Sequence, residues 1–312
     1  MSQGGLAGQS PASEVSVADY EVVLVTYHSA DQLSGLLEAA DPEQRLVVVD
    51  NASGADAVAD IVARFPHGRY LDGVDSGFAS AANAGARSST AEYLVFSNPD
   101  SRPTPEIWAK LVADLRADPT LVSVSAAPVD PTGHIEIGAG GYEPSVGRAI
   151  AHAIGLHRVA PSAGVYARPE VGAVVDLDWL NAACMAVPRE AFLKLGGWDE
   201  RYFVYNEDMA FGRKVREAGL KQRLRTDLLV PHATGGSGGS GGTKMPQQRG
   251  ASMRSYLRHH NGRVAADAMV GALTAGTLVR IAGALVRGKT TLARQHQAYV
   301  RGILTGRSPY QD

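Results

Sequence analysis

Acidic side chains directly follow apolar segments at three places in the sequence. Asp50 ends one apolar run, Asp100 follows another after a short turn, and the pair Glu207-Asp208 opens a helical segment. In parallel α/β sheets, ligands bind beyond the carboxyl ends of the strands. Each acid alone also fits a turn or a helix N-terminus. Their convergence on one edge of one sheet predicts a shared site.

Carboxylate and imidazole groups in such a site suit a divalent cation bound to a diphosphate. Asp100 is the candidate carboxylate ligand, and His232, at the end of an apolar run, is the candidate imidazole ligand. Mg²⁺ or Mn²⁺ held there would stabilise the negative charge that grows when a sugar leaves a nucleoside diphosphate. For His232 the alternative is a hydrogen-bonded histidine at a strand end.

A transfer reaction also needs a base for the incoming hydroxyl group, and a carboxylate within hydrogen-bonding reach is suitable. Glu207 and Asp208 are adjacent at the start of a helix, so their side chains point about 100° apart and at most one of them is the base. We choose Asp208 and place Glu207 on the acceptor side. The alternative is that both acids only stabilise the helix N-terminus.

The segments that must position these residues alternate between strands and helices in the first half of the chain. Apolar runs at 21–26, 45–50 and 93–96 predict buried strands. Apolar periodicity at 31–40, 55–65, 79–87 and 105–118 predicts helices. Continuous apolar strands separated by helices predict an α/β fold with a mostly parallel central sheet and helices on both faces.

The second half of the chain is less regular. Residues 128–171 predict loops and short edge strands, and 174–187 predict one strand that returns to the sheet. A helix is expected at 207–218, a strand at 228–232, a mobile Gly-Ser loop at 235–242 and mostly helix from 249 to 306. We therefore expect a disordered lead-in at 1–18, a catalytic domain at 19–244 and a helical extension at 245–312.

Composition limits the classes of protein. Hydrophobic residues make up 45% of the 312 residues, which allows a sizeable core, and the formal net charge of −2 favours no nucleic-acid partner. Cys184 is the only cysteine, so a packed residue in a reducing, cytoplasmic compartment is expected. No apolar run is expected to reach the ~18–20 residues that span a bilayer, and the N-terminus does not resemble a signal peptide.

Basic residues dominate the chain from Lys244 onward. This asymmetry suggests a surface that faces an anionic group, such as a lipid headgroup or a pyrophosphate. Three arrangements of the C-terminal helices remain open. They pack on the catalytic domain as a solvated tail, contact the inner face of the cell membrane as a peripheral surface, or form a homodimer interface.

Several motifs occur together and in a fixed order between about residues 22 and 234. Together they resemble family 2 of the glycosyltransferases, in particular its bacterial rhamnosyltransferase-like members. The motifs are Val25-Thr-Tyr-His28, Val47-Val-Val-Asp-Asn-Ala-Ser53, Gly77-Phe-Ala-Ser-Ala-Ala-Asn83, Ser97-Asn-Pro-Asp100, Trp179-Leu-Asn-Ala-Ala-Cys-Met185, Gly196-Gly-Trp-Asp-Glu200, Tyr202-Phe-Val-Tyr-Asn-Glu-Asp208 and His232.

The resemblance implies a GT-A fold with a nucleotide-sugar site. Thr26, Tyr27 and Asp50 look like the nucleoside pocket, and Asn83 resembles a further nucleotide contact. Asn98-Pro99-Asp100 stands at the family's metal-binding Asp-x-Asp motif, with Asn98 in place of the first acid. His28 stands where the family often has Asn, and a buried structural histidine is expected there.

On the acceptor side, the resemblance places the segment 179–185 beneath the acceptor. Trp179 is therefore a candidate contact for a sugar ring, although packing in the core is the alternative that we favour for its indole. Trp198 has the same two interpretations.

The function implied by this resemblance is an inverting glycosyltransferase with a metal cofactor. Our expectation is transfer of L-rhamnose from dTDP-β-L-rhamnose to a cell-envelope glycan or a polyprenyl-pyrophosphate-linked acceptor. The alternatives are a UDP-hexose or UDP-galactofuranose donor on the same fold, and a non-catalytic protein that binds nucleotide sugars.

Overall fold

The computed structural model describes residues 15–233 and 242–310. At its centre is an eight-stranded sheet with the strand order β3-β2-β1-β4-β9-β5-β10-β7. Only β9 and β7 run antiparallel to the other strands. This is the mostly parallel α/β sheet that the sequence predicts. The strands are β1 Tyr20–Thr26, β2 Leu46–Asp50, β3 Gly68–Asp72, β4 Tyr93–Ser97, β5 Leu121–Val129, β7 Val174–Leu177, β9 Cys184–Pro188 and β10 Lys221–Pro231.

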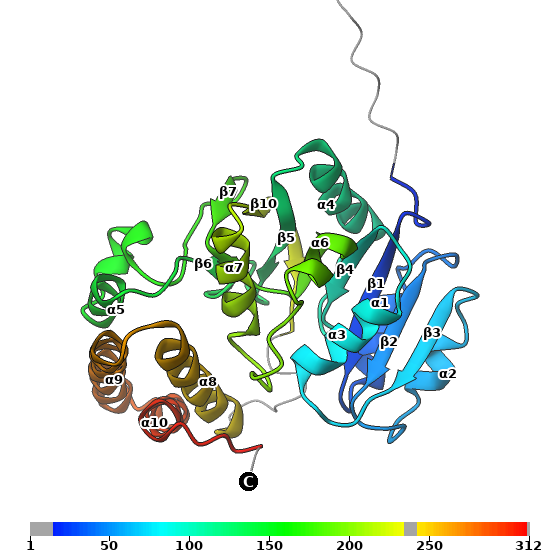
Figure 1. Cartoon of the computed structure of the whole chain (residues 1–312). Coiled ribbons are helices and arrows are strands. Elements are labelled where there is room, and N and C mark those ends of the chain that lie inside the picture. The colour runs from blue at the N-terminus through cyan, green and yellow to red at the C-terminus, as the bar shows by residue number, and fades with distance from the viewer. Residues whose placement is uncertain (1–14, 234–241, 311–312) are drawn as a thin grey trace, which may run out of the picture.

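Helices cover both faces of this sheet (Figure 1). Successive side chains of a strand point to opposite faces, so Val22 and Leu24 enter one core while Val23 enters the other. The first core lies under α1, α2 and α4, and the second lies under α3, α6 and α7. These helices are α1 Ala30–Leu37, α2 Val58–Val62, α3 Phe78–Ser88, α4 Pro105–Ala117, α6 Arg189–Lys194 and α7 Glu207–Glu217.

The expectation of one strand at 174–187 is wrong, because the segment divides into three elements. β7 pairs with β10, and β9 lies between β4 and β5. Between them, β8 (Trp179–Leu180) pairs with β6 (Gly140–Gly141) in a separate small sheet. Asn181 turns the chain toward β9, because its side-chain oxygen accepts a hydrogen bond from the Ala183 N–H at 2.7 Å. Apolar content continues across these breaks, so periodicity does not reveal them.

The expectation of only loops and edge strands at 128–171 is also wrong. This segment contains α5 (Val146–Ala153) and two short 3₁₀ turns, Leu156–Arg158 and Pro161–Ala163. Ser145 caps α5, since its hydroxyl oxygen accepts a hydrogen bond from the Arg148 N–H at 3.3 Å. The helix packs on the C-terminal helices, a tertiary contact that local sequence does not encode.

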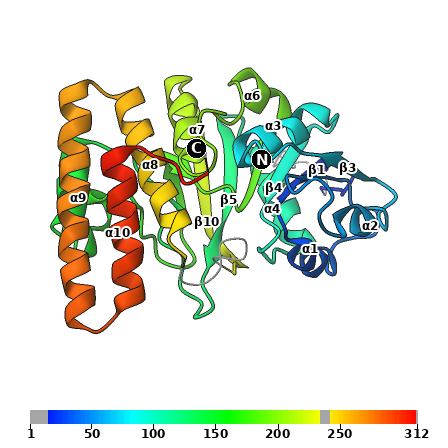
Figure 2. The same cartoon turned by 90° about the horizontal axis from the view of Figure 1, so that it is seen from below.

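The C-terminal helices share a core with the α/β body. α8 (Lys244–His260), α9 (Arg263–Val286) and α10 (Thr290–Thr305) lie side by side (Figure 2). A third apolar cluster combines Trp179 and Met209 of the body with Tyr256 and Met269 of these helices. The Tyr256 hydroxyl also donates a hydrogen bond to Glu143 at 2.7 Å. The C-terminal helices are therefore packed onto the α/β body by buried side chains, in addition to the covalent connection.

α9 corrects the expectation that no apolar run reaches membrane-spanning length. Among the residues that the structure describes, this 24-residue helix is long and apolar enough to cross a bilayer by length and composition, with a mean hydropathy of 1.7 over 18 residues. Of that window, 39% is buried inside the chain. Val, Leu, Ile and Ala make up most of the helix, and Arg263, Asp267 and Arg280 are its only charged residues.

Two other expectations fall mostly outside the described residues. The Gly-Ser segment 235–242 is described only at Gly242. The lead-in 1–18 is described only from Val15, which packs against the first core, and is followed by a turn in which the Ser16 N–H donates a hydrogen bond to Asp19 at 2.7 Å.

A buried asparagine ties α3 to the turn before α7. The Asn83 amide nitrogen donates to the Trp198 carbonyl and to Glu200, both at 2.8 Å, and its oxygen accepts from the Trp198 N–H at 2.9 Å. All three contacts join segments more than 110 residues apart in the chain. Removing the amide would leave buried polar groups without partners, which is costly.

We expect Asn83→Ala to lower the free energy of unfolding by about 2–3 kcal/mol, as for other losses of buried hydrogen bonds. Asn261→Ala is the matched control, because the Asn261 amide makes a single 3.0 Å bond at the partly exposed end of α8. Urea denaturation of both variants measures the difference. Equal losses in the two variants would contradict the proposed tie.

Candidate active site

The carboxyl ends of the parallel strands gather the predicted residues at one sheet edge. Thr26 ends β1, Asp50 ends β2, Asp100 follows β4 and His232 follows β10. Non-glycine residues with left-handed backbone also follow these strands: His28 after β1, Ser53 after β2 and Asp75 after β3. Such conformations are disfavoured and concentrate at functional sites. This edge of the sheet therefore carries both the candidate ligand side chains and the strained backbone conformations.

Asp100 and His232 meet because two turns are bonded together at this edge. The Arg102 N–H donates to the Pro231 carbonyl at 2.9 Å, and the Ala233 N–H donates to the Asp100 carbonyl at 3.0 Å. This clamp brings the Asp100 carboxylate to 3.2 Å from Nε2 of His232. The Asn98 amide lies 3.4 Å from the same nitrogen. The two side chains proposed as metal ligands are therefore in direct contact.

Glu136, which the sequence analysis missed, completes this group. Its carboxylate lies 3.1 Å from Nδ1 of His232, so the imidazole stands between two carboxylates. Burial alone would lower the pKa of His232, but hydrogen bonds and attraction from both carboxylates raise it to about 9. Glu136 follows β5, the strand beside β10, and its segment has no periodicity that would reveal this position.

The donor set fits a cation that is shared with a substrate. Among the described residues, no three His, Cys, Asp or Glu side chains are arranged to hold a metal ion. Mg²⁺ and related ions commonly bind one or two carboxylates together with substrate phosphates. A ligating histidine usually donates its other ring N–H to a carboxylate, and Glu136 occupies that place at Nδ1 of His232. Asp100 and His232 are therefore candidate protein ligands, and a bound cation would replace the proton that the raised pKa keeps on the imidazole.

The Glu207-Asp208 pair begins α7 after a strained turn. Tyr205 and Asn206 both have left-handed backbone, with φ of 69° and 71°. Glu207 is buried, and burial together with the charge of Asp208 raises its pKa well above the usual range. Asp208 is partly exposed, and burial raises its pKa to about 6. Asp208 is therefore the more accessible acid of the pair.

Arg249 of α8 connects the two acidic groups electrostatically. Its positive charge lowers the pKa of Asp208, opposing the larger effect of burial. It also interacts with Glu136, the partner of His232, and its guanidinium lies 4.6 Å from the centre of the Tyr205 ring. The C-terminal helices thus contribute a charged side chain to the same edge as the predicted base and the His232 group.

On the nucleotide side, Asp50 organises the loop after β2. Its carboxylate accepts hydrogen bonds from the Thr26 hydroxyl at 3.1 Å and from the N–H groups of Ala52 and Gly54 at 3.0 and 2.9 Å. Asp50 and Thr26 are fully buried, whereas Tyr27 is 43% exposed. Tyr27 is therefore the one of these three residues with a surface open to a ligand.

Other predicted residues lie inside the protein. The buried Asn83 amide is fully occupied by the turn at Trp198. Trp179 is only 2% exposed, with its indole N–H donating to the Tyr142 carbonyl at 3.2 Å and its ring packed edge-on against Tyr166. Trp198 is equally enclosed. His28 shows the opposite, since it is exposed with φ of 49°, and the expectation of a buried histidine there is wrong.

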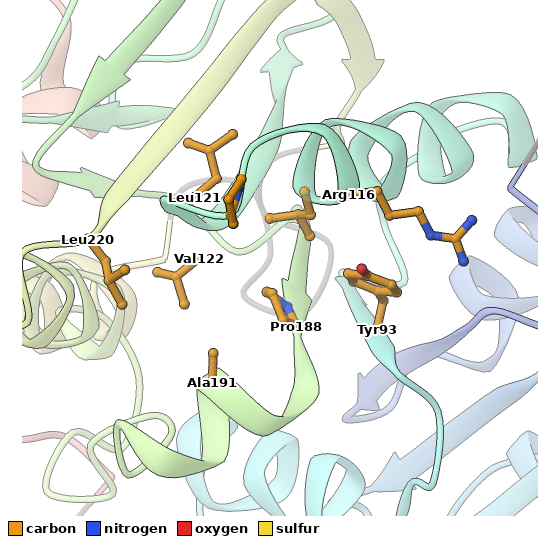
Figure 3. Close-up of a pocket in the computed structure, with 9 residues that line it drawn as sticks. Tyr93, Arg116, Leu121, Val122, Pro188, Ala191 and Leu220 are labelled. Carbon is orange, nitrogen blue, oxygen red and sulfur yellow. The ribbon is translucent and has the colours of Figure 1, made fainter. Parts of the chain in front are cut away.

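A cavity of about 350 Å³ lies away from these groups (Figure 3). Its lining includes Tyr93 at the start of β4, Leu121 at the start of β5 and Leu220 just before β10. These positions belong to the amino ends of the parallel strands. The cavity is therefore at the opposite edge of the sheet from Asp100 and His232.

The fold is shared with solved glycosyltransferases. A mannosyltransferase from Pyrobaculum calidifontis in complex with GDP-Man and Mn²⁺ aligns over 92% of this chain and 86% of its own, with a TM-score of 0.60 and 19% identity. GalNAc-T7 with UDP, GalNAc and Mn²⁺ aligns over 75% of this chain and 47% of its own, with a TM-score of 0.52 and 16% identity. The chain therefore has the GT-A fold of these glycosyltransferases.

Sequence similarity gives the family. The model of "Glycosyl transferase family 2" matches residues 21–137. An N-acetylglucosaminyl-diphospho-decaprenol L-rhamnosyltransferase of Mycobacterium tuberculosis is 28% identical over 228 residues, which cover 64% of this chain and 70% of the relative. Residues 21–137 thus match a family 2 glycosyltransferase domain, and the chain resembles rhamnosyltransferases.

We expect the Asp208 carboxyl group to titrate with a pKa of about 6, well above an ordinary aspartate, because burial disfavours its charge. Arg249→Gln should raise this pKa further, since a stabilising positive charge is lost. Carbon-13 NMR of aspartate-labelled protein measures both values, and Asp208→Asn assigns the signal.

Arg258→Gln is the control, because Arg258 lies on the same helix but pairs with Asp267. It should leave the titration of Asp208 unchanged. An Asp208 midpoint near 4, or equal shifts in the two arginine variants, would contradict the electrostatic arrangement.

Proposed function

We propose that this protein is an inverting, metal-dependent transferase that moves L-rhamnose from dTDP-β-L-rhamnose to a hydroxyl group of a cell-envelope glycan or a lipid-linked acceptor. The observation that carries the proposal is the contact of Asp100 with His232 at 3.2 Å. Arg249, which acts electrostatically on both Asp208 and Glu136, links this group to the proposed base. The mycobacterial relative, named for rhamnosyl transfer to a diphospho-decaprenol acceptor, supports this choice of sugar and acceptor. The buried, free Cys184 agrees with a cytoplasmic location.

The nucleoside of the donor lies against the loops after β1 and β2 in this proposal. Tyr27 offers its exposed ring to the base. Thr26 and Asp50 act as positioning residues, because their mutual hydrogen bond and the Asp50 bonds to backbone N–H groups fix the loop. Asn83 and Trp179 likewise act through the segments that they hold rather than through direct contact.

The donor diphosphate lies at Asp100 and His232. A Mg²⁺ or Mn²⁺ ion on these two residues, when bound, neutralises the diphosphate and stabilises the charge of the leaving nucleotide. Glu136 holds the imidazole in place through Nδ1, so that Nε2 points at the Asp100 carboxylate. The Mn²⁺ in the solved mannosyltransferase and in GalNAc-T7 supports the choice of cofactor.

Asp208 takes the proton of the acceptor hydroxyl group. The acceptor oxygen forms a bond to the anomeric carbon while the bond from that carbon to the diphosphate oxygen breaks on the opposite face. One displacement of this kind inverts the carbon and releases the nucleoside diphosphate. A pKa of about 6 leaves Asp208 ionised at neutral pH yet basic enough to accept a proton. Burial and the charge of Asp208 raise the pKa of the neighbouring Glu207 in turn.

The experiment that tests this function follows donor consumption and product formation with a lipid-diphosphate acceptor. We expect dTDP-rhamnose to be consumed in the presence of Mg²⁺ or Mn²⁺, with inversion visible by NMR. Asp208→Asn should reduce kcat by about 100-fold or more, as for the loss of a general base, while dTDP affinity by calorimetry stays unchanged.

The same experiment separates the alternatives. Tighter binding of UDP than dTDP, with turnover of a UDP-sugar, would replace the proposed donor; the UDP in the GalNAc-T7 complex keeps this alternative in view. Full activity of Asp208→Asn would remove Asp208 as the base. Binding of nucleotides without consumption of any donor would favour the non-catalytic alternative.

Glu136 provides a test of the metal proposal. We expect Glu136→Ala to weaken Mn²⁺ binding in the presence of dTDP by about 10–100-fold, as for other residues that orient a ligating histidine. Glu136→Gln should restore part of the affinity, because its amide oxygen still accepts a hydrogen bond from Nδ1. Electron paramagnetic resonance of free Mn²⁺ measures the affinity without turnover. Equal affinities in the wild type and Glu136→Ala would contradict the role of Glu136.

A further inference from the structure

The outward face of α9 consists of apolar residues and glycine. Every residue of the helix that is exposed between positions 268 and 286 belongs to these types. This stretch is roughly 27 Å long at the rise of an α-helix. The residues are Ala268, Gly271, Ala275, Leu278, Val279, Ala282, Leu285 and Val286. A helix on the surface of a soluble protein normally turns charged or polar side chains to the solvent, so this apolar stripe marks a contact surface.

The neighbouring helix α10 shows what a solvated face looks like in the same part of the fold. Most of its exposed positions are polar, among them Arg294, Gln297, Arg301 and Thr305. The exposed apolar residues Leu292 and Leu304 lie near its two ends. Both helices pack against α8 and against each other, and Figure 2 shows them side by side at one end of the molecule. The apolar stripe is therefore specific to α9.

The segment around α5, which packs against α9, exposes further apolar side chains. α5 crosses α9 closely, since a Cβ on Gly276 would lie 2.6 Å from the Cα of Ala153, and Arg280 donates a hydrogen bond to the His152 carbonyl at 3.1 Å. Four large apolar side chains of this segment are exposed. They are Ile150, Ile154, Leu156 and Val159.

The charge around this surface is predominantly positive. Residues 146–168 and 244–310 together contain 14 Lys and Arg but a single acid, Asp267, whereas the rest of the chain contains 16 Lys and Arg and 31 acids. Arg263 lies at the start of α9, and Arg287 and Lys289 lie just beyond its end. The apolar stripe is thus bordered by basic side chains at both ends.

The apolar stripe and its basic border favour one binding partner for this surface over the others. A second copy of this chain would bring two strongly basic surfaces together, which like-charge repulsion disfavours. An anionic lipid surface complements both the apolar stripe and its basic border. A spanning arrangement would require α9 to leave its inner contacts, because Met269, Leu273 and Ile281 are buried against the rest of the chain.

We propose that the outward face of α9, together with the exposed side chains near α5, lies in the headgroup region of an anionic membrane, with the helix axis in the membrane plane. Leu278, Val279, Leu285 and Val286 enter the acyl boundary, while Arg263, Arg287 and Lys289 contact phosphate groups. This surface goes beyond the transfer reaction, and its lipid binding needs neither donor nor acceptor.

The test is sedimentation of the full chain with vesicles of phosphatidylglycerol and phosphatidylcholine. We expect binding to vesicles rich in phosphatidylglycerol, little binding to pure phosphatidylcholine, and weaker binding at high salt. Val279→Asp should lower the partition coefficient about tenfold or more, since a 71% exposed apolar side chain at the centre of the contact becomes charged. Arg287→Gln with Lys289→Gln should lower it several-fold for anionic vesicles.

Val171→Asp is the matched control, because Val171 is 61% exposed but lies just before β7, outside this surface. It should bind vesicles like the wild type, and circular dichroism should be equal for all variants. Equal binding of Val279→Asp and wild type, or no preference for the anionic lipid, would overturn the proposal. So would a wild-type dimer in light scattering that Val279→Asp dissociates without vesicle binding by either protein, because a second copy would then cover α9.

Discussion

A single imidazole between two carboxylates holds the functional edge of this protein together. His232 brings Asp100, after β4, and Glu136, after β5, to the end of β10. A buried charge is stable only when it has partners, so the three loops must keep their relative positions for the group to persist. The backbone bonds of Arg102 and Ala233 fix two of these loops. The geometry of these three side chains is therefore set without a ligand.

Much of this edge could be predicted from the sequence, because parallel strands place their carboxyl ends together. Asp50, Asp100 and His232 were found from their positions after apolar runs, although Asp100 and His232 are more than 130 residues apart. Their contact follows from topology rather than from local preference. Cys184 and Trp198, for which packing was the favoured interpretation, are both buried in the core.

The remaining features depend on tertiary contacts that no local pattern carries. Glu136 lies in an irregular segment and reaches His232 only because β5 pairs with β10. α5 forms where Gly276 allows α9 to approach. Residues 174–187 stay apolar through two changes of direction, so their periodicity predicts one strand where there are three. The family resemblance implied that Asn83 contacts the nucleotide, yet its amide is hydrogen-bonded to Trp198 inside the protein.

The C-terminal helices connect the apolar outward face of α9 with the candidate active site. α8 supplies Arg249, which acts on Asp208, and it packs tightly on α10, because a Cβ on Gly302 would collide with the Gln247 carbonyl. α9, with the apolar outward face, packs on α10 and α5. Close-packed interiors have few voids and transmit strain. A change in the orientation of α9 would therefore also move Arg249. If α9 anchors the protein to a membrane, Asp208 would therefore lie at a fixed distance from the lipid surface. Arg249, whose charge acts on Asp208, belongs to the same packed helices that set this distance.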